Sequence, residues 1–300
     1  MKRLDSHHHL WQVDRGDYHW MPDSGPLRED YLPDRLLPEL ASNGIEATIL
    51  VQAAQTVEET DFLLEIASAI SQIVGVTGWI NLEDPAAPDH AQRLMEQGPL
   101  VAIRPMLHDL DDPEWIARPS VVDNLRQIQQ LGLRLEILSL PQHLEPVYSV
   151  LEQLPNLPTV IDHLSKPSYC RDKDKEWRVQ MSRIAQLPHV HCKISGMVTE
   201  VGDEWRTTDF APYVEHALES FGPERLMFGS DWPVCRKVAE YHDVVELVDR
   251  LISRLAPEAS EAFWSANARQ FYGVAPPPTP PGEKPLAPAP YSKVKSEVDQ

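Results

Sequence analysis

Eight short runs rich in β-branched residues alternate along this chain with longer amphipathic stretches, and this alternation restricts its fold more than any other feature. We expect strands at Arg3–His7, Ala47–Gln52, Val74–Asn81, Val101–Met106, Leu133–Ser139, Thr159–His163, Val190–Ser195 and Arg225–Ser230. Helical patterns lie between or after them, for example at Val57–Ile73, Val121–Leu131, Leu144–Leu154, Phe210–Phe221, Val238–Leu255 and Ala259–Phe271. Short strands separated by helical patterns indicate βαβ units and a parallel sheet.

Eight such units are the number that closes a (β/α)₈ barrel. The competing architecture, an open doubly wound sheet, normally carries a glycine-rich phosphate turn after its first strand. Here the first strand runs directly into Ser6–His9, without a GxGxxG pattern. We therefore expect an α/β protein with a distorted TIM-type barrel, forming a single domain over residues 1–274.

The composition changes abruptly after Val274. Eight of the sixteen residues from Ala275 to Pro290 are proline, and a short charged stretch follows. Such a sequence cannot form the interior of a helix or sheet, and it has too little apolar surface to offset its ordering entropy. Residues 275–300 are predicted to be a disordered, proline-rich tail.

The charge and the apolar pattern exclude two classes of partner. A formal net charge of −19 argues against nucleic acid, because a phosphate backbone requires a basic surface. No stretch of 18 apolar residues is present to span a membrane, and the N-terminus lacks the apolar region of a signal peptide. The three cysteines are far apart, without CxxC spacing, which fits a reduced cytoplasmic location. Nothing in the sequence indicates an oligomeric state.

Histidine and aspartate residues fall at the ends of three predicted strands, which is where barrel enzymes place their active sites. The first strand ends in His7–His9, the sixth in His163 and the eighth in Asp231. Since side chains alternate along a strand, His7 and His9 are expected to point together into the barrel mouth. Three imidazoles and a carboxylate can hold a divalent metal or perform acid–base chemistry.

Six segments of the chain, taken in order, resemble the amidohydrolase-related proteins (amidohydrolase 2 type) grouped with L-fuconolactonase and L-rhamnonolactonase. These segments are Leu4–Trp11, Gly78–Leu82, Ile103–Met106, Val160–Pro167, Lys193–Gly196 and Leu226–Pro233. The resemblance covers about residues 3–273. It implies a distorted barrel that hydrolyses sugar-acid or related lactones, with one metal, most simply Zn²⁺, or with none.

The resemblance also implies site residues. Carried onto this sequence, His7, His9, His163 and Asp231 match the metal or catalytic positions, and Arg104, Lys166 and Trp232 match positions near the substrate pocket. Two departures are visible. Ile103–Met106 supplies no bridging lysine or glutamate at the end of the fourth strand, and the fifth strand lacks a terminal histidine, the nearest being His143. A binuclear centre is therefore not expected.

A mechanism can be assigned to these residues as a hypothesis. Asp231 would act as general base toward water, while His163, with His7 and His9 or a metal they hold, would polarise the lactone carbonyl. Arg104, whose planar fork allows bidentate hydrogen bonds, would orient a substrate oxygen unless it is a buried ion-pair partner.

Further side chains are candidates for binding the substrate itself. Lys166, Gln52 and Asn81 would hydrogen-bond polar substituents, although Lys166 has the alternative of being a solvated loop lysine. Trp11 and Trp232 would form an apolar wall for the ring.

Two other functions remain open from the sequence. A metal-dependent decarboxylase of a small unsaturated or aromatic acid would use a similar set of ligands, and a catalytically silent barrel could bind a sugar acid. A serine nucleophile is not supported, because no GxSxG motif is present.

Overall fold

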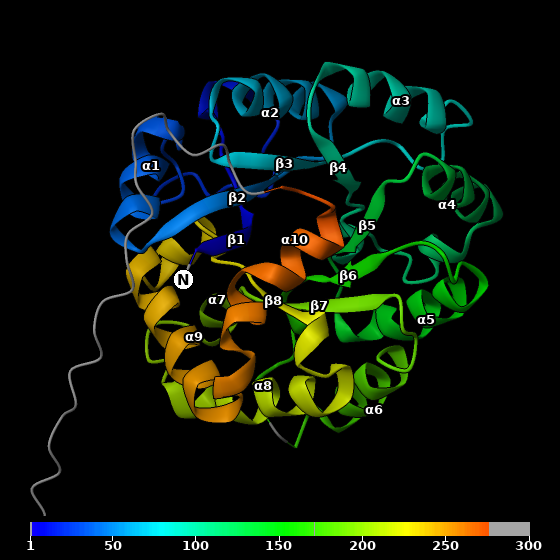
Figure 1. Ribbon diagram of the computed structural model, residues 1–300. Coiled ribbons are helices and arrows are strands. Elements are labelled where there is room, and N and C mark those ends of the chain that lie inside the picture. Colours follow the sequence, from blue (N-terminus) through cyan, green and yellow to red (C-terminus); the bar gives the residue numbers. More distant parts are fainter. Residues whose placement is uncertain (1, 171, 276–300) are drawn as a thin grey trace, which may run out of the picture.

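Eight parallel strands pair in chain order and nearly close into a barrel, as the sequence predicts (Figure 1). The computed structural model describes residues 2–170 and 172–275. The strands are β1 (Arg3–His8), β2 (Ile45–Val51), β3 (Ile73–Gly78), β4 (Leu100–Ile103), β5 (Arg134–Ile137), β6 (Thr159–Ile161), β7 (Val190–Ile194) and β8 (Leu226–Phe228). The predicted tail after residue 274 lies, apart from Ala275, outside the described residues.

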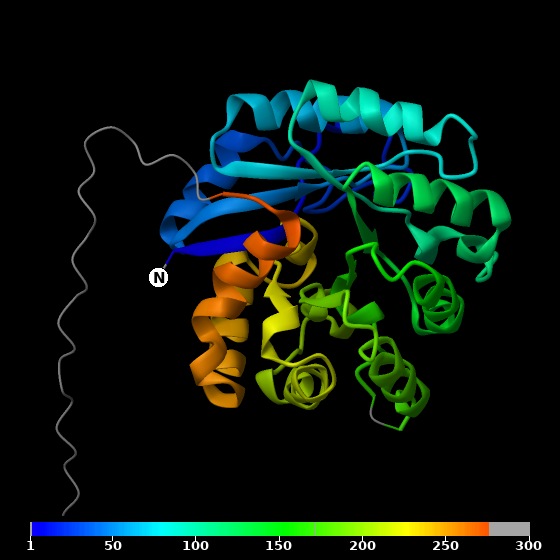
Figure 2. The ribbon, with the colours of Figure 1, turned by 45° about the vertical axis from the view of Figure 1, so that its right-hand side comes forward.

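Helices surround this ring of strands, as Figures 1 and 2 show from two directions. They are α1 (Pro33–Ser42), α2 (Val57–Ala69), α3 (Ala87–Gln97), α4 (Pro119–Gln130), α5 (Leu144–Gln153), α6 (Lys175–Ile184), α7 (Met197–Val201), α8 (Thr207–Phe221), α9 (Tyr241–Leu255) and α10 (Asn267–Tyr272). The helix predicted at Val57–Ile73 ends earlier, because Ile70 is extended and Ile73 already belongs to β3. The one predicted at Ala259–Phe271 is divided into a 3₁₀ turn, a π-helical turn and α10.

The last strand meets the first just beyond β8. The amide of Asp231 donates to the carbonyl of His7 over 2.8 Å, and the amide of His9 donates to the carbonyl of Trp232 over 2.7 Å. These bonds bring the ends of β8 and β1 together, so residues 222 or more positions apart in the sequence lie side by side. The mouth of the barrel is thereby formed from both ends of the described chain.

The opposite end of the barrel is covered by α10, drawn in orange across the strands in Figure 1. Its Phe271 and Tyr272 pack with apolar strand residues, including Leu4 near the start of β1. Arg134, the first residue of β5, donates to the carbonyl of Phe271 over 2.8 Å. The interior is therefore closed by α10 at the amino-terminal ends of the strands, whereas the carboxyl-terminal ends border a cavity.

None of the helices in residues 2–170 and 172–275 has both the length and the apolar character needed to traverse a lipid bilayer.

Candidate active site

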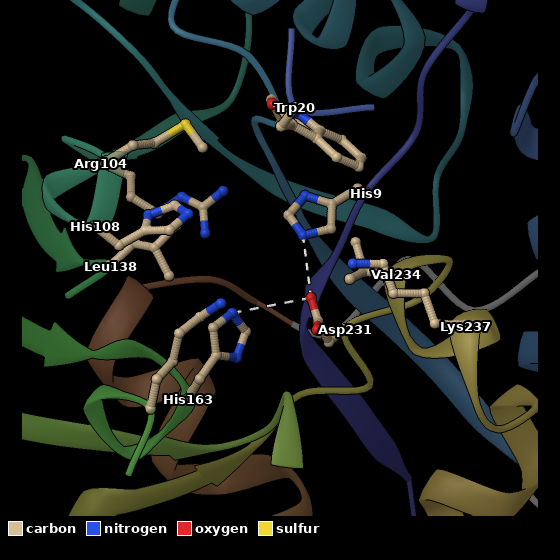
Figure 3. Close-up of a pocket in the computed structure, with 12 residues that line it drawn as sticks. His9, Trp20, Arg104, His108, Leu138, His163, Asp231, Val234 and Lys237 are labelled. Carbon is tan, nitrogen blue, oxygen red and sulfur yellow. Dashed lines mark hydrogen bonds and ion pairs between the residues drawn. The ribbon is translucent and has the colours of Figure 1, made fainter. Parts of the chain in front are cut away.

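A cavity of about 200 Å³ opens at the carboxyl-terminal ends of the strands (Figure 3). This is the end of a barrel at which catalytic residues are found. Its lining residues are His9, Trp20, Ala53, Arg104, Met106, His108, Leu138, His163, Lys166, Asp231, Val234 and Lys237.

Asp231 lies between two imidazoles in this cavity, as Figure 3 shows. Its Oδ1 atom is 3.3 Å from Nε2 of His9 and 3.9 Å from Nε2 of His163. Asp231 has a positive φ of 57°, a conformation uncommon for a residue other than glycine, and a hydrogen bond from its amide to the carbonyl of His7 holds it there. This backbone turn places the carboxylate between the two rings.

The orientation of His9 is set by the neighbouring strand. Its Nδ1 lies 2.9 Å from the carbonyl oxygen of Val51. Because a carbonyl can only accept, Nδ1 carries a hydrogen, and Nε2 is the atom that faces Asp231. A proton or a bound cation is needed to join this second nitrogen to the carboxylate. The His9–Asp231 contact is therefore a position at which a cation can bind.

His163 reaches the cavity through an unusual turn. Strand β6 ends at Ile161, two residues earlier than predicted, because His163–Lys166 all have positive φ, between 46° and 56°. Left-handed backbone costs about 1–2 kcal/mol for each such residue, so neighbours must hold it. Trp177 donates to the carbonyl of Leu164 over 2.7 Å, and the Ser139 and Ser165 hydroxyls lie 2.8 Å apart. The turn directs both His163 and Lys166 into the cavity.

His7 lies beneath these groups, with none of its surface exposed. Its ring centroid is 5.0 Å from that of His9 and 4.5 Å from that of His163. The side chain of His8 turns away and contacts the Thr48 hydroxyl at 3.0 Å. His7 and His9 thus point toward one site while His8 does not, in the arrangement that strand alternation predicts.

Four charged side chains form a buried cluster beneath the cavity, which we call the core network: Arg104, Glu136, Asp162 and Lys193. Lys193 donates to Glu136 over 2.7 Å and lies 3.2 Å from Asp162, whose other oxygen is 3.2 Å from Arg104. Thr77 and Tyr272 donate to the second oxygen of Glu136. All four charged groups are at most 1% exposed, and opposite charges are paired.

Burial and neighbouring charges set the protonation of the site. Burial by itself raises the pKa of Asp162, but Lys193 and Arg104 outweigh it and hold this pKa below its usual range. Burial lowers the pKa of His7 well below its ordinary value, and Lys193 lowers it further. The pKa of His163 is likewise well below the ordinary value, chiefly because of burial. At pH 7 both imidazoles are therefore neutral.

Asp231 is also ionised at neutral pH. Burial raises its pKa, but His163 and His9 lower it more, so the net pKa lies below that of an ordinary aspartate. An ionised carboxylate at the edge of a cavity can accept a proton from water or bind a cation. The cavity therefore contains a base that is available over the whole neutral range.

In the part of the chain that the structure describes, two groups of side chains have the composition and spacing of a divalent-metal site. The first group is His7, His9 and Asp231, and the second group is His7, Asp162 and His163. In each, three ligand atoms lie within 4.8 Å of one another. Neutral imidazole with carboxylate is a donor set that suits Zn²⁺ and related cations. The donors present in the first group, together with the cation position between His9 and Asp231, fit such an ion.

Arg104 and Lys166, two of the residues predicted to bind substrate, both line the cavity. Lys166 also forms an ion pair with Glu200 at 3.1 Å. Arg104 is at once a cavity residue and a buried ion-pair partner, so the two alternatives considered for it are compatible. Gln52 donates to the carbonyl of Arg104 over 2.9 Å and does not border the cavity, which makes it a support for Arg104.

Three other expected substrate contacts lie elsewhere. Asn81 is exposed and accepts a hydrogen bond from the amide of Glu83, in a separate hollow. Trp11 is fully buried and donates to the carbonyl of Glu29, and Trp232 is 2% exposed. Neither indole lines the cavity. These aromatic rings instead pack behind the cavity wall.

The wall contains residues that the sequence reasoning did not identify. Trp20 and His108 border the cavity, and Trp20 is held by a 2.6 Å hydrogen bond to the carbonyl of Ala53. Both residues belong to irregular connections that follow strands. Such segments have no periodic sequence pattern from which the direction of a side chain could be predicted. Val234 and Lys237 follow the eighth strand closely, and their short distance from Asp231 in the sequence was the available signal.

Comparison with known proteins places this geometry in a family. Residues 4–274 match the sequence profile of the amidohydrolases. The chain belongs to the amidohydrolase family. The resemblance seen in the sequence is thus confirmed, and the histidines and aspartate described above lie at the strand ends of a family barrel.

Two curated relatives are similar over nearly their whole length. Proteins named L-fucono-1,5-lactonase from Burkholderia ambifaria and Burkholderia multivorans are 35% and 37% identical, over 91% and 92% of this chain and 96% and 97% of their own. A crystal structure of an amidohydrolase from Burkholderia multivorans with bound zinc has a TM-score of 0.84 at 34% identity. It covers 92% of this chain and 100% of that one.

A more distant structure shares the fold alone. The 2,6-dihydroxybenzoate decarboxylase from Rhizobium has a TM-score of 0.66 at 14% identity, over 91% of this chain and 99% of its own. At that identity the likeness says nothing about the reaction.

Proposed function

We propose that this protein hydrolyses a small sugar-acid lactone to the corresponding hydroxy acid. The supporting observation is the position of Asp231, an ionised carboxylate between two imidazoles in the cavity of an amidohydrolase barrel. The two relatives at 35% and 37% identity carry the name L-fucono-1,5-lactonase, which favours a lactone among the substrates of the family.

Asp231 would serve as the general base. Its carboxylate accepts a proton from water as the water oxygen bonds to the lactone carbonyl carbon. The same proton then passes to the ring oxygen when the bond between that oxygen and the carbonyl carbon breaks. Lactone and water are consumed together, and the hydroxy acid formed loses a proton to the medium at neutral pH.

The carbonyl oxygen gains negative charge during this attack and needs donors that are already in place. Arg104 carries a permanent positive charge, is fixed by the carbonyl of Gln52 and by Asp162, and borders the cavity. His163 lies on the other side of Asp231 and is fixed at Nδ1 by the Ser195 hydroxyl, 2.8 Å away. Donors held rigidly in a buried site stabilise a developing oxyanion at little reorganisation cost.

A divalent cation, with Zn²⁺ the simplest choice, would be held by the first group, His7, His9 and Asp231. When bound there, such an ion acts as a Lewis acid and lowers the pKa of a coordinated water. The residues named above keep their roles in orienting the substrate and accepting the proton.

The cavity suits a single small ring with polar substituents. Trp20 supplies an aromatic surface, on which the apolar face of a sugar ring can lie. Lys166, Lys237 and His108 place donors around it for hydroxyl groups. Its volume of about 200 Å³ is below the range of about 300–1,000 Å³ usual for ligand pockets, which favours a monosaccharide-derived lactone.

A panel of aldonolactones with a pH-indicator readout, run with and without a chelator, tests the proposal. Turnover of at least one lactone with release of one proton per molecule is expected. Release of CO₂ from an aromatic or unsaturated acid, without lactone turnover, would identify a decarboxylase. Binding of sugar acids with no turnover of either class would identify a silent barrel, and both outcomes would reject lactone hydrolysis.

A further inference from the structure

A second hollow lies beside the cavity, formed by the connections that follow β1, β2 and β4. We call it the outer hollow, and its volume is about 300 Å³. Three residues, Trp20, Ala53 and Met106, line both spaces, so the cavity and the outer hollow are immediate neighbours. The other residues of the outer hollow are Asp17, His19, Ala54, Gln55 and Asp109.

The cavity alone is small for a substrate-binding site. At about 200 Å³ it is below the range of about 300–1,000 Å³ usual for ligand pockets, and the adjoining outer hollow brings the combined space into that range. The outer hollow is the larger of the two spaces. A ligand whose ring occupies the cavity therefore has room for a substituent that extends past Trp20.

The two spaces differ in the charge of their walls. Three cations, Arg104, Lys166 and Lys237, line the cavity. The outer hollow is lined by two carboxylates, those of Asp17 and Asp109, and by no lysine or arginine of the described residues. A carboxylate or phosphate substituent would be repelled there, whereas hydroxyl groups can donate hydrogen bonds to the carboxylate oxygens.

Both carboxylates are oriented by neighbours and keep the capacity to accept further hydrogen bonds. Oδ2 of Asp17 accepts from Arg15 over 2.6 Å, and no other group within residues 2–170 and 172–275 donates to Asp17. Oδ2 of Asp109 accepts from Gln55 over 3.4 Å, and its Oδ1 lies 3.1 Å from Nε2 of His108. Because each carboxylate offers about four acceptor positions, both can also bind a ligand hydroxyl.

Trp20 is a fixed wall between the two spaces. Its indole nitrogen donates to the carbonyl of Ala53 over 2.6 Å. The amides of Ala53 and Ala54 donate in turn to the buried carboxyl of Glu59 over 3.0 and 2.7 Å. An aromatic ring held beside carboxylate and amide groups suits a sugar, whose apolar face can lie on the ring while its hydroxyls bind the polar groups.

We propose that the outer hollow is a subsite for a neutral, hydroxyl-bearing substituent of the lactone, supplied either by an exocyclic polyol chain or by a linked second sugar. The lactone ring lies in the cavity, and the substituent passes Trp20 to reach Asp17 and Gln55. This inference rests on the proposed hydrolysis of lactones and specifies which lactones are preferred. The residues of the subsite determine specificity and take no part in the chemical step.

The test compares lactones of one ring configuration that differ in one substituent, which is hydrogen, methyl, a dihydroxyethyl chain or a linked glucose. Wild type is expected to show a kcat/KM about tenfold higher for a hydroxylated lactone than for the methyl one, because one or two added hydrogen bonds correspond to that factor. The better of the two hydroxylated lactones identifies the substituent as a chain or a sugar. Equal kcat/KM values for all four lactones overturn the proposal.

Two variants show whether the preference arises in the outer hollow. Gln55→Trp fills the hollow from an exposed position and should abolish the preference. Asp17→Asn replaces one acceptor oxygen by a donor and should reduce the preference about threefold, so it also serves if Gln55→Trp does not fold. Gln127→Trp, at an exposed position on α4, is the matched control and should keep the wild-type preference. A full preference in either hollow variant overturns the proposal.

Lactams, in which a ring nitrogen replaces the ring oxygen, allow the same comparison without turnover. In calorimetric titrations of wild type, the lactam with the hydroxylated substituent should bind more tightly than the methyl lactam, and Gln55→Trp should remove this difference. If no lactone is hydrolysed, the proposed function fails while these titrations still decide the inference. Equal affinities in wild type, or binding of neither lactam, overturn it.

Discussion

The mouth of the barrel and the core network beneath it both contain buried carboxylates but differ in the groups that lie beside them. In the core network each carboxylate has an ammonium or guanidinium within 3.2 Å. At the mouth, the ion-pair partners of Asp231 among the described residues are imidazoles, that of His9 at 3.3 Å and those of His7 and His163 at 3.9 Å. Paired charges stabilise a geometry, whereas a carboxylate without a fixed cation remains free to bind a ligand or a proton.

The largest effect is expected from Asp231→Asn. Asparagine keeps the shape but cannot accept the proton, and general-base catalysis is worth about 10²–10⁴-fold in typical enzymes. Lactone turnover should fall by that order while thermal stability changes little. The exposed Asp203→Asn is the matched control and should retain full activity. Unchanged turnover in the Asp231 variant would remove this carboxylate from the mechanism.

A substitution of Glu136 in the core network should lower the stability of the folded protein and not act on the chemical step. Glu136→Ala leaves Lys193 without its shortest contact, and loss of one partner of a buried pair costs about 3–5 kcal/mol. Urea unfolding should show a loss of that size. Glu145→Ala breaks a surface pair with Arg183, which water screens, and should change the stability far less. Equal losses in the two variants would show that burial does not distinguish the two ion pairs.

Glu59 is a buried carboxyl near the mouth whose hydrogen bonds come from backbone amides, those of Ala53 and Ala54. Burial raises its pKa to about 8 from 4.5. The folded state therefore holds this proton more tightly than the unfolded chain, and its contribution to stability falls as pH rises from 4.5 toward 8.

Glu59→Gln should remove this dependence. At about 1.4 kcal/mol per pKa unit, the difference in unfolding free energy between variant and wild type should change by a few kcal/mol between pH 5 and 8, in favour of the variant at pH 8. Urea titrations at both pH values measure it. A constant difference across this range would mean that Glu59 is already ionised at pH 5.

Arg104 belongs to both regions, since it lines the cavity and pairs with Asp162. Arg104→Lys keeps the charge but loses the planar fork that contacts Gln52 and Asp162 together. Hydrogen bonds to charged groups contribute about 1.5–3 kcal/mol, so kcat/KM should fall by about 10–100-fold. Arg118→Lys, at an exposed pair with Asp112, should have no effect. A pure loss of stability without a kinetic change would place Arg104 with the core network alone.

Two tryptophans, Trp20 in the cavity wall and Trp11 in the core, allow the two regions to be compared. The effect on catalysis expected from Trp20→Ala is smaller than those predicted above. Trp20→Ala should raise KM about tenfold, because about 1.4 kcal/mol of apolar contact with the substrate corresponds to that factor. Trp11→Ala, fully buried, should instead lower the unfolding free energy by about 3–5 kcal/mol. An unchanged KM for Trp20→Ala would mean that the ring does not contact the substrate.

The strands were predictable because their alternation with helices is a property of the whole chain. Once this alternation had located the strands, it also located the residues at their ends, such as His9 and Asp231. The positive φ values of His163–Lys166 could not be predicted from the sequence, since none of these residues is glycine. Tertiary contacts, including the hydrogen bond from Trp177, hold that turn against local preference.

The other differences between prediction and structure arise in irregular connections and at polar residues inside strands. Trp20 lies in the long connection between β1 and α1, whose direction no periodic pattern encodes. Glu136 and Lys193 stand within strands, where alternation alone does not tell an inward from an outward side chain. Asn81 follows β3 by three residues, and the chain has already turned away from the cavity there.

The left-handed run His163–Lys166 also bears on how this protein can change its substrate. Both ends of the run carry a cavity residue, so an insertion or deletion within it would displace His163 and Lys166 together. By contrast, the described connection between β1 and α1 contributes Trp20 to the cavity wall without a second cavity residue that would move with it. Over evolutionary time, and in directed selection, new ring shapes should therefore be accommodated by variation around Trp20, while the segment after β6 stays fixed in length.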